Sequence, residues 1–231
     1  NSSTKTTYYI PSSLKTVILT DCEHIPSGAF YNCTGLTTIH IPDSITFIGN
    51  DAFYGCSGLE SITIPESITS ISWCSFMDCS RLKTVQLHSG IKRIVNSAFS
   101  GCYCLTSIDI PSGVTAIEGH VFSGCLSLTS VTIPSSVDTI MSGAFSGCSS
   151  LPSINIPAGV SEIWDYAFSN CSSLTSLTLP SGISYIAPHL VEGCSSLESI
   201  NIPSKVDSIG EYAFAGCSSL KSIIVPSGVT D

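Results

Sequence analysis

The sequence carries little charge. Asp, Glu, Lys and Arg make up 11% of its 231 residues, less than half the share of about 25% that is typical of soluble domains. Only 8 residues are Lys or Arg against 17 Asp or Glu, which gives a net charge of −9. Such a chain lacks the basic surface that displaces counterions from phosphates. This argues against nucleic acid and anionic membranes as partners.

Long apolar runs are also absent, although 43% of the residues are hydrophobic. No run approaches the roughly 18 residues that cross a bilayer, so we expect no membrane insertion by this chain. The N-terminal stretch NSSTKTTYY is polar, does not begin with Met and contains no signal segment. We interpret the chain as a mature or recombinant fragment with any export signal already removed, so the absence of a signal segment says nothing about compartment.

What the sequence does have is a 23-residue repeat. Its first column is leucine in nine rows of nine: Leu36, Leu59, Leu82, Leu105, Leu128, Leu151, Leu174, Leu197 and Leu220. Aliphatic residues follow three and five positions later, and then a proline in eight of nine rows, with His88 as the exception. The consensus is LxxIxIPxxVxxIxxxAFxxCxx. Repeats of this length indicate a solenoid, in which each row buries its apolar face only by stacking on its neighbours.

The repeat predicts the local structure of each row. The alternation in LxxIxI indicates a short strand with its aliphatic residues inward, and the proline ends its hydrogen-bonding ladder. A turn and a second short extended segment should follow, and the AFxxC segment should form a helical turn with Phe in the core. We expect one domain at residues 14–231, with about nine full repeats and a partial last one, after a polar N-terminal segment at residues 1–13.

Cysteine occupies one column of the repeat: Cys33, Cys56, Cys79, Cys102, Cys125, Cys148, Cys171, Cys194 and Cys217. Free cysteine is small and among the most buried residue types. An odd number of equivalent thiols cannot pair off completely, and no base repeats beside them, so we predict a structural thiol ladder. Cys22, Cys74 and Cys104 lie off this column, and we expect them to be the most exposed thiols, with an additional disulfide left open.

The motif IPxxVxxIxxxAFxxCxxLxxI resembles the BspA-like, or Treponema pallidum type, leucine-rich repeats over residues 14–231. The resemblance implies a curved right-handed solenoid with a parallel sheet on its concave face. It also implies a large protein at the surface of anaerobic, gut or oral bacteria or of some parasitic protists, with roles in adhesion. Ser75, Val121, the pair Leu190-Val191 and His88 depart from the motif. We expect local irregularity in the rows that start at Leu82 and Leu174.

Two surfaces are candidates for binding. The outward column of the strands varies from row to row, so it is where a repeat scaffold can place specificity; its candidates are His40, Gln86, Asp109, Asn155 and Asn201. The alternative is an edge patch of aromatic residues in neighbouring rows: Trp164, Tyr166, Tyr185 and Tyr212. Exposed aromatics can stack on sugar rings or anchor a protein, although here they can also simply cover the ends of apolar columns.

The sequence offers no cofactor, metal or catalytic site. His120 and His189 share a column but lie three rows apart, about 14 Å at the stacking distance of strands, which is too far for one zinc ion. An enzyme on a parallel β-helix would need charged residues clustered across adjacent rows, whereas Asp109 stands alone in its column. We therefore expect no enzyme activity.

The hypothesis that fits best is a cell-surface interaction or adhesion module, extracellular and part of a larger exported protein. Its expected partner is an extracellular protein or glycan. The alternative is a structural spacer or stalk within a larger surface protein. Because the last row stops after 12 residues and leaves an apolar rung open, we also expect either end-to-end self-association or a missing C-terminal portion.

Overall fold

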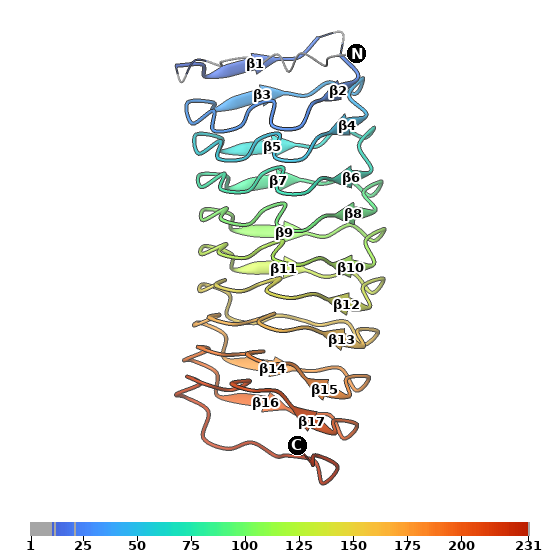
Figure 1. The fold of residues 1–231 in the computed structure, drawn as a ribbon, viewed down its shortest axis with the longest axis vertical. Helices are drawn as coiled ribbons and strands as arrows, with labels where there is room; N and C mark the ends of the chain where they lie inside the picture. The colour runs from blue at the N-terminus through green and yellow to red at the C-terminus, as the bar shows by residue number, and fades with distance from the viewer. Residues whose placement is uncertain (1–10, 12, 21, 231) are drawn as a thin grey trace, which may run out of the picture.

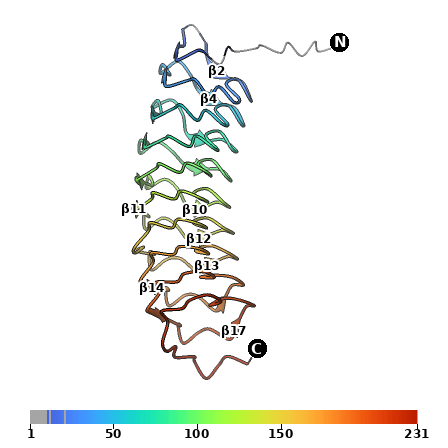
Figure 2. The same ribbon diagram turned by 90° about the vertical axis from the view of Figure 1, so that its left-hand side faces the viewer.

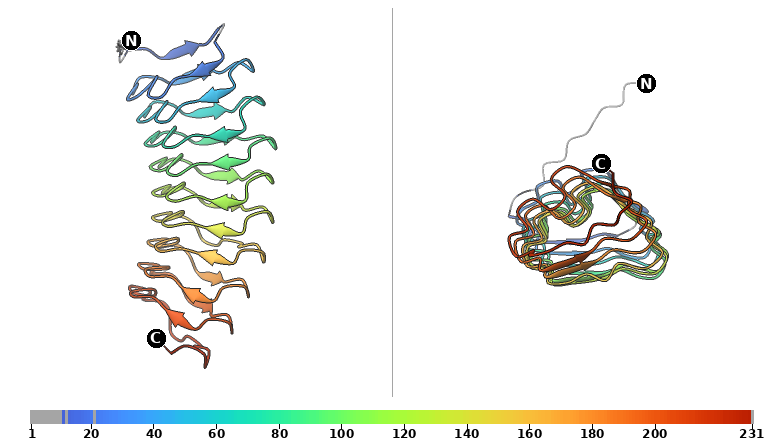
Figure 3. Two further views of the ribbon diagram at one scale, coloured as in Figure 1. Left: turned by 45° about the vertical axis from the view of Figure 1, so that its right-hand side comes forward. Right: turned by 90° about the horizontal axis from the view of Figure 1, so that it is seen from below.

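The computed structural model describes residues 11, 13–20 and 22–230, and the segment predicted at residues 1–13 lies largely outside this range. The described residues form a parallel β-solenoid whose coils stack in one column from the N-terminal to the C-terminal end (Figure 1). Viewed from the side, the coils follow one another without a break (Figure 2). Viewed along the axis, they superimpose on one closed outline, and the stack bends into a shallow arc (Figure 3).

Each coil contributes up to two strands. The first strands, of three residues, are β1 (Thr16–Ile18), β3 (Thr38–His40), β5 (Ser61–Thr63), β7 (Thr84–Gln86), β9 (Ser107–Asp109), β11 (Ser130–Thr132), β14 (Ser176–Thr178) and β16 (Ser199–Asn201). The second strands, of two residues, are β2 (His24–Ile25), β4 (Phe47–Ile48), β6 (Ser70–Ile71), β8 (Arg93–Ile94), β10 (Ala116–Ile117), β12 (Thr139–Ile140), β13 (Glu162–Ile163), β15 (Tyr185–Ile186) and β17 (Ser208–Ile209).

The strands pair in parallel with the register that the repeat predicts. Ile108 of β9 lies opposite Val131 of β11, and Ile140 of β12 lies opposite Ile163 of β13, in each case 23 residues apart. This register keeps every aliphatic column inward, since a shift of one residue would turn it to solvent. The sheets are short, because hydrogen-bonded pairing is interrupted at intervals along the stack, for example between β13 and β15.

The row that starts at Leu151 has no first strand, although Ile154 and Ile156 are buried. In most other rows the residue after the leucine donates its N–H to the preceding coil, as Thr129 does to the Thr106 carbonyl at 2.9 Å. Pro152 occupies this position and has no N–H to donate. The predicted irregularity in the rows starting at Leu82 and Leu174 is wrong, since both contain both strands.

The core is built of identical side chains stacked from coil to coil. Seven phenylalanines lie face to face with ring centroids 5.1 to 6.0 Å apart: Phe30, Phe53, Phe76, Phe99, Phe122, Phe145 and Phe168. The pair Leu190-Val191 replaces Ala-Phe in the next coil and is fully buried. The larger Leu190 beside the smaller Val191 keeps the local volume, as cores require.

The AFxxC segment forms a run of tight turns, and the described residues contain no helix. Amides in this segment alternate between two kinds of partner. Phe53 N–H donates to the Ser75 carbonyl of the next coil at 2.8 Å, whereas Cys56 N–H donates to Phe53 of its own coil at 3.1 Å. Two residues in each coil have left-handed backbone, for example Asp51 (φ 55°) and Gly55 (φ 68°). Such residues end a right-handed helix, so the predicted helical turn is reduced to linked turns.

Candidate binding site

The five candidates on the first-strand column, His40, Gln86, Asp109, Asn155 and Asn201, are all exposed. Three of them are engaged within the solenoid. Thr63 donates to Gln86 Oε1 at 2.9 Å, and Thr132 donates to Asp109 Oδ1 at 2.6 Å. Asn201 accepts from the Leu179 N–H at 2.6 Å and donates to the Leu179 carbonyl at 3.1 Å. These side chains therefore already serve to join one coil to the next.

The structure divides the predicted edge patch into two parts. Trp164 and Tyr185 line one cleft of about 260 Å³, and Tyr166 and Tyr212 do not. The cleft is completed by Ser161, Glu162, Ile163, Asp165, Ser184 and Ala187, which come from two successive coils. We call these eight residues the Trp164 cleft.

The second strands position the walls of the Trp164 cleft. Ile163 of β13 and Ile186 of β15 are buried. Because side chains alternate along a strand, the preceding residues, Glu162 and Tyr185, point outward in the same column one coil apart. Trp164 follows β13 directly, and its backbone N–H donates to the Ile140 carbonyl of the previous coil at 2.9 Å. The sheet stops at β13, and β15 begins another sheet with β17, so the cleft lies where the two coils are not paired by strands.

Polar contacts orient the aromatic walls. The indole Nε1 of Trp164 donates to Glu162 Oε2 at 3.1 Å, which holds the ring beside the carboxylate. Partial burial and the negative charge of Asp165 raise the pKa of Tyr185. Trp164 and Tyr185 are nevertheless 44% and 42% exposed, so both present free ring surface to solvent. The cleft thus combines two open aromatic rings with two carboxylates and two serine hydroxyls.

Tyr166 and Tyr212 form a separate stack with His189 between them. The ring centroid of Tyr166 lies 4.2 Å from that of His189, and Tyr212 lies 5.1 Å from His189 on the next coil. All three have left-handed backbone, with φ between 56° and 59°. His189 Nδ1 lies 2.7 Å from Glu192 Oε2. Stacking between coils occupies these rings in part, which distinguishes them from the two rings of the Trp164 cleft.

The nine cysteines predicted as a ladder are free thiols at the core or its margin. Eight of them, from Cys56 to Cys217, donate S–H to a carbonyl of the preceding coil at 3.1 to 3.4 Å, usually that of its phenylalanine. Burial raises the pKa of Cys56, Cys125 and Cys194 to about 12. Because the thiolate is the nucleophile, these side chains are inert at neutral pH.

The three cysteines outside the ladder differ in burial. Cys22 and Cys104 are partly exposed and free. Cys74 is buried with 4% exposure, so the prediction that it is among the most exposed thiols is wrong. It occupies a left-handed position (φ 51°) of the turn segment. Its pKa is raised to about 11, mainly by burial and to a smaller extent by the negative charge of Asp51.

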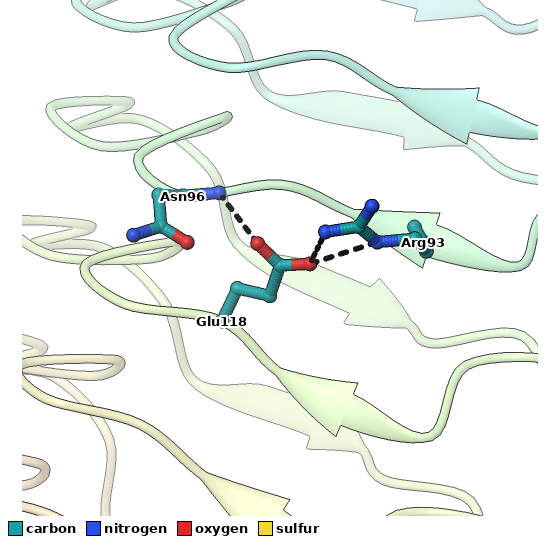
Figure 4. Close-up of polar contacts among 3 residues, drawn as sticks. All are labelled: Arg93, Asn96 and Glu118. Carbon is teal, nitrogen blue, oxygen red and sulfur yellow. Dashed lines mark hydrogen bonds and ion pairs between the residues drawn. The ribbon is translucent and has the colours of Figure 1, made fainter.

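Three acidic residues with a role in the structure were not predicted from the sequence. Glu162 and Asp165 of the Trp164 cleft were not singled out, although Glu162 shares the column of Tyr185 and could have been found from it. The other case is Glu118, which accepts from Arg93 Nη2 at 2.7 Å and Nε at 3.1 Å and from the Asn96 N–H at 3.2 Å (Figure 4). This carboxylate joins the coils of β8 and β10, whose strands are not paired.

The part of the chain that the structure describes contains no group of three or more His, Cys, Asp or Glu residues placed to hold a metal ion. Across residues 11, 13–20 and 22–230, no helix is long and apolar enough to cross a membrane.

Stacked 23-residue coils, parallel strands and a leucine column define the class as a leucine-rich-repeat solenoid. The chain belongs to the BspA type leucine rich repeat family, which matches residues 4–129 and 117–231. It is thus a repeat protein of a kind that serves protein interaction. No curated protein matches the sequence.

Several solved structures are similar to this chain. A leucine rich cell surface protein from Faecalibacterium prausnitzii is 25% identical, with 91% of this chain and 87% of that one covered at a TM-score of 0.56. The pneumococcal vaccine antigen PcpA is 22% identical, with 74% of this chain and 52% of that one covered at a TM-score of 0.54. The Treponema pallidum leucine rich repeat protein is 28% identical, with 89% and 77% covered at a TM-score of 0.46.

Proposed function

We propose that the chain is a non-catalytic adhesion module, exposed at a cell surface, that binds an extracellular protein of a host or neighbouring cell through the Trp164 cleft. The observation that carries the proposal is the pair Trp164 and Tyr185, both more than 40% exposed on one cleft. Tryptophan and tyrosine are the residues most enriched at binding hot spots. The F. prausnitzii relative, which is described as a cell surface protein, supports the location.

The cleft is a better candidate than the first-strand column. The column presents small polar side chains, and three of its five candidates are hydrogen bonded to neighbouring coils. Hot spots usually need a large side chain that a partner can desolvate. The first-strand column is therefore better explained as a solvated polar surface, and the Trp164 cleft as the place where a partner protein is anchored.

The test is saturable binding of the purified chain to an immobilised panel of extracellular-matrix proteins, measured by surface plasmon resonance. We expect the double variant Trp164→Ala/Tyr185→Ala to weaken binding at least tenfold. Trp73→Ala is the matched control, because Trp73 is exposed to a similar extent (47%) on a distant coil. A second control, Gln86→Ser/Asp109→Ser, changes the first-strand column.

Each result has a distinct reading. Equal loss with Trp73→Ala would show a general effect of surface aromatics and would overturn the proposal. Loss only in the Gln86→Ser/Asp109→Ser variant would move the site to the first-strand column. Absence of binding to every partner would favour the spacer role. Labelling of intact producing cells with an antibody against the chain tests the surface location directly.

A further inference from the structure

The Trp164 cleft combines aromatic rings with negative charge, and this combination is specific in what it attracts. Glu162 uses one oxygen, Oε2, to accept from the Trp164 indole. Asp165 lies close enough to Tyr185 for its charge to raise the pKa of the phenol. The face of an aromatic ring is itself electron-rich and attracts cations. Every strongly polar feature of the cleft therefore favours a positively charged group.

No positive side chain of the neighbouring sequence neutralises this charge. Residues 94 to 204 contain no Lys or Arg, but they contain seven acidic residues: Asp109, Glu118, Asp138, Glu162, Asp165, Glu192 and Glu198. The ion pairs within the described part of the chain use other carboxylates, namely Glu60, Glu66, Glu118 and Glu192. The cleft is thus open to a cation from outside.

We propose that the Trp164 cleft receives an arginine side chain from a basic segment of the partner protein, an inference that rests on the proposed function. A guanidinium is planar, stacks on aromatic faces and presents donors in a fork that matches a carboxylate. Trp164 and Tyr185 provide the aromatic surfaces. Glu162 and Asp165 accept the N–H groups.

The size and charge of the cleft disfavour other occupants. Its volume of about 260 Å³ lies below the range of about 300–1,000 Å³ typical of pockets for drug-sized ligands, and suits a single side chain. Sulfated and sialylated glycans, anionic lipids and nucleic acid would all be repelled by a stretch that carries seven carboxylates and no Lys or Arg. A neutral sugar could stack on the rings but would leave the two carboxylates without a charged partner.

The test compares two small probes on the intact chain, N-acetyl-arginine methylamide and its citrulline analogue, which replaces the guanidinium with a neutral urea of similar shape. Only two tryptophans are present, so the variant Trp73→Phe leaves Trp164 as the sole tryptophan reporter of binding by fluorescence. We expect the arginine probe to bind at least tenfold more tightly than the citrulline probe. A neutral methyl glycoside serves as the third probe.

Charge-neutral variants test whether the two carboxylates act locally. Glu162→Gln/Asp165→Asn should weaken binding of the arginine probe at least tenfold. Glutamine keeps the shape of Glu162 and a side-chain oxygen, so the hydrogen bond from the Trp164 indole is retained. Asp109→Asn/Glu198→Gln removes the same charge at acidic residues that do not line the cleft and should leave binding within twofold. Equal affinity for arginine and citrulline, preference for the glycoside, or full binding in Glu162→Gln/Asp165→Asn would each overturn the inference.

The inference and the proposed function fail separately. If a matrix protein binds through Trp164 and Tyr185 but the arginine probe does not compete for the site, only the arginine inference fails. If the arginine probe binds as expected but the chain binds no protein of the panel, the chemistry of the cleft stands and the adhesion role fails.

Discussion

The cysteine column supplies hydrogen-bond donors as well as small apolar side chains. Each thiol from Cys56 onward donates to a carbonyl of the preceding coil, and that carbonyl generally also accepts an amide of its own coil. Alanine would fill much of the same space but would leave this bond unmade, and serine would place a more polar group in a dry core. Cysteine both fills the apolar core and donates this hydrogen bond, which explains physically why the column is cysteine rather than another small residue.

The raised thiol pKa values predict that stability falls at alkaline pH. Cys56, Cys125 and Cys194 have a pKa of about 12, against 9.0 when unperturbed. Between these values the unfolded chain loses protons that the folded chain keeps, so the free energy of unfolding decreases as pH rises. The contribution is fully present below pH 9 and is lost toward pH 12. The slope is about 1.4 kcal/mol per pH unit for each thiol.

Urea unfolding at a series of pH values from 8 to 11 measures this slope. Other groups also titrate in this range, so the informative quantity is the difference between the wild type and Cys125→Ala. We expect the variant to be less stable at pH 8 and to lose stability more slowly above pH 9, by about 1.4 kcal/mol per unit. Parallel pH dependences in the two proteins would show that Cys125 does not contribute.

His88 is the one residue that breaks the proline column, and its side chain is poorly satisfied. Its side chain is 9% exposed, and its Nδ1 lies 3.1 Å from Glu66 Oε2 and accepts from the Gly90 N–H at 3.2 Å. Its Nε2 is buried with no hydrogen-bond partner within the described residues. The equivalent prolines accept a turn hydrogen bond through their carbonyls, as His88 does from the Ile91 N–H at 3.2 Å. Proline can therefore replace His88 without loss of that bond.

We expect His88→Pro to stabilise the protein. The substitution removes a buried unpaired group and restricts the unfolded chain, together worth about 1–2 kcal/mol. That corresponds to a rise in Tm of about 2–8 °C for a chain of this size, measurable by differential scanning calorimetry. His88→Ala serves as the control, since it removes the imidazole without the restriction and should gain less. A lower Tm for His88→Pro would mean that the contact of His88 with Glu66 is stabilising.

At the scale of the turn segment, side chains of one coil cover glycines of the next. The second left-handed column holds only glycine, Asn or Asp, and where Asn or Asp occurs the next coil always has glycine: Asn32 with Gly55, Asp78 with Gly101, and Asn170 with Gly193. A Cβ on Gly101 would lie 2.1 Å from Asp78 Oδ1, whereas one on Gly147 would lie 3.6 Å from its nearest neighbour. Gly101 and Gly147 thus share a backbone conformation, but only Gly101 has no room for a Cβ atom.

This difference predicts unequal costs for the same substitution. Both glycines have φ above 70°, so Gly147→Ala should cost about 1–2 kcal/mol for the left-handed backbone alone. Gly101→Ala should cost more, because Asp78 must also move. Adding Asp78→Gly should reduce the penalty of Gly101→Ala toward that of Gly147→Ala, a coupling that chemical denaturation of the four variants measures. Equal costs for the two alanine variants would contradict the steric reading.

The repeat predicted the strands and their register well, because alternation and the proline column are local signals. The first left-handed position of each coil was not predictable, since residues as different as Asp51, Cys74 and His120 share one conformation. For the candidate site, sequence spacing indicated which aromatics lie in neighbouring coils. It did not indicate that Trp164 and Tyr185 share a cleft, because that depends on side-chain direction.

On the scale of the whole molecule, contacts run almost entirely between adjacent coils. A solenoid of this kind is stabilised by a sum of coil and interface terms, so the effect of a substitution depends on its place in the stack. Phe99 lies between Phe76 and Phe122 and is fully buried, whereas Phe30 stacks on Phe53 at the N-terminal end of the column. Removing Phe99 weakens two interfaces in the middle of the stack, and removing Phe30 weakens its end.

We therefore expect Phe99→Ala to destabilise the whole array by about 3–5 kcal/mol and to divide unfolding into two phases. Phe30→Ala should instead loosen only the first coils, because the remaining interfaces still form a continuous core. Hydrogen exchange followed by mass spectrometry resolves the two cases. Loss of protection should be confined to the coils before Leu59 in Phe30→Ala and should extend to both sides of β9 in Phe99→Ala. Uniform loss in both variants would show that the coils unfold as one cooperative unit.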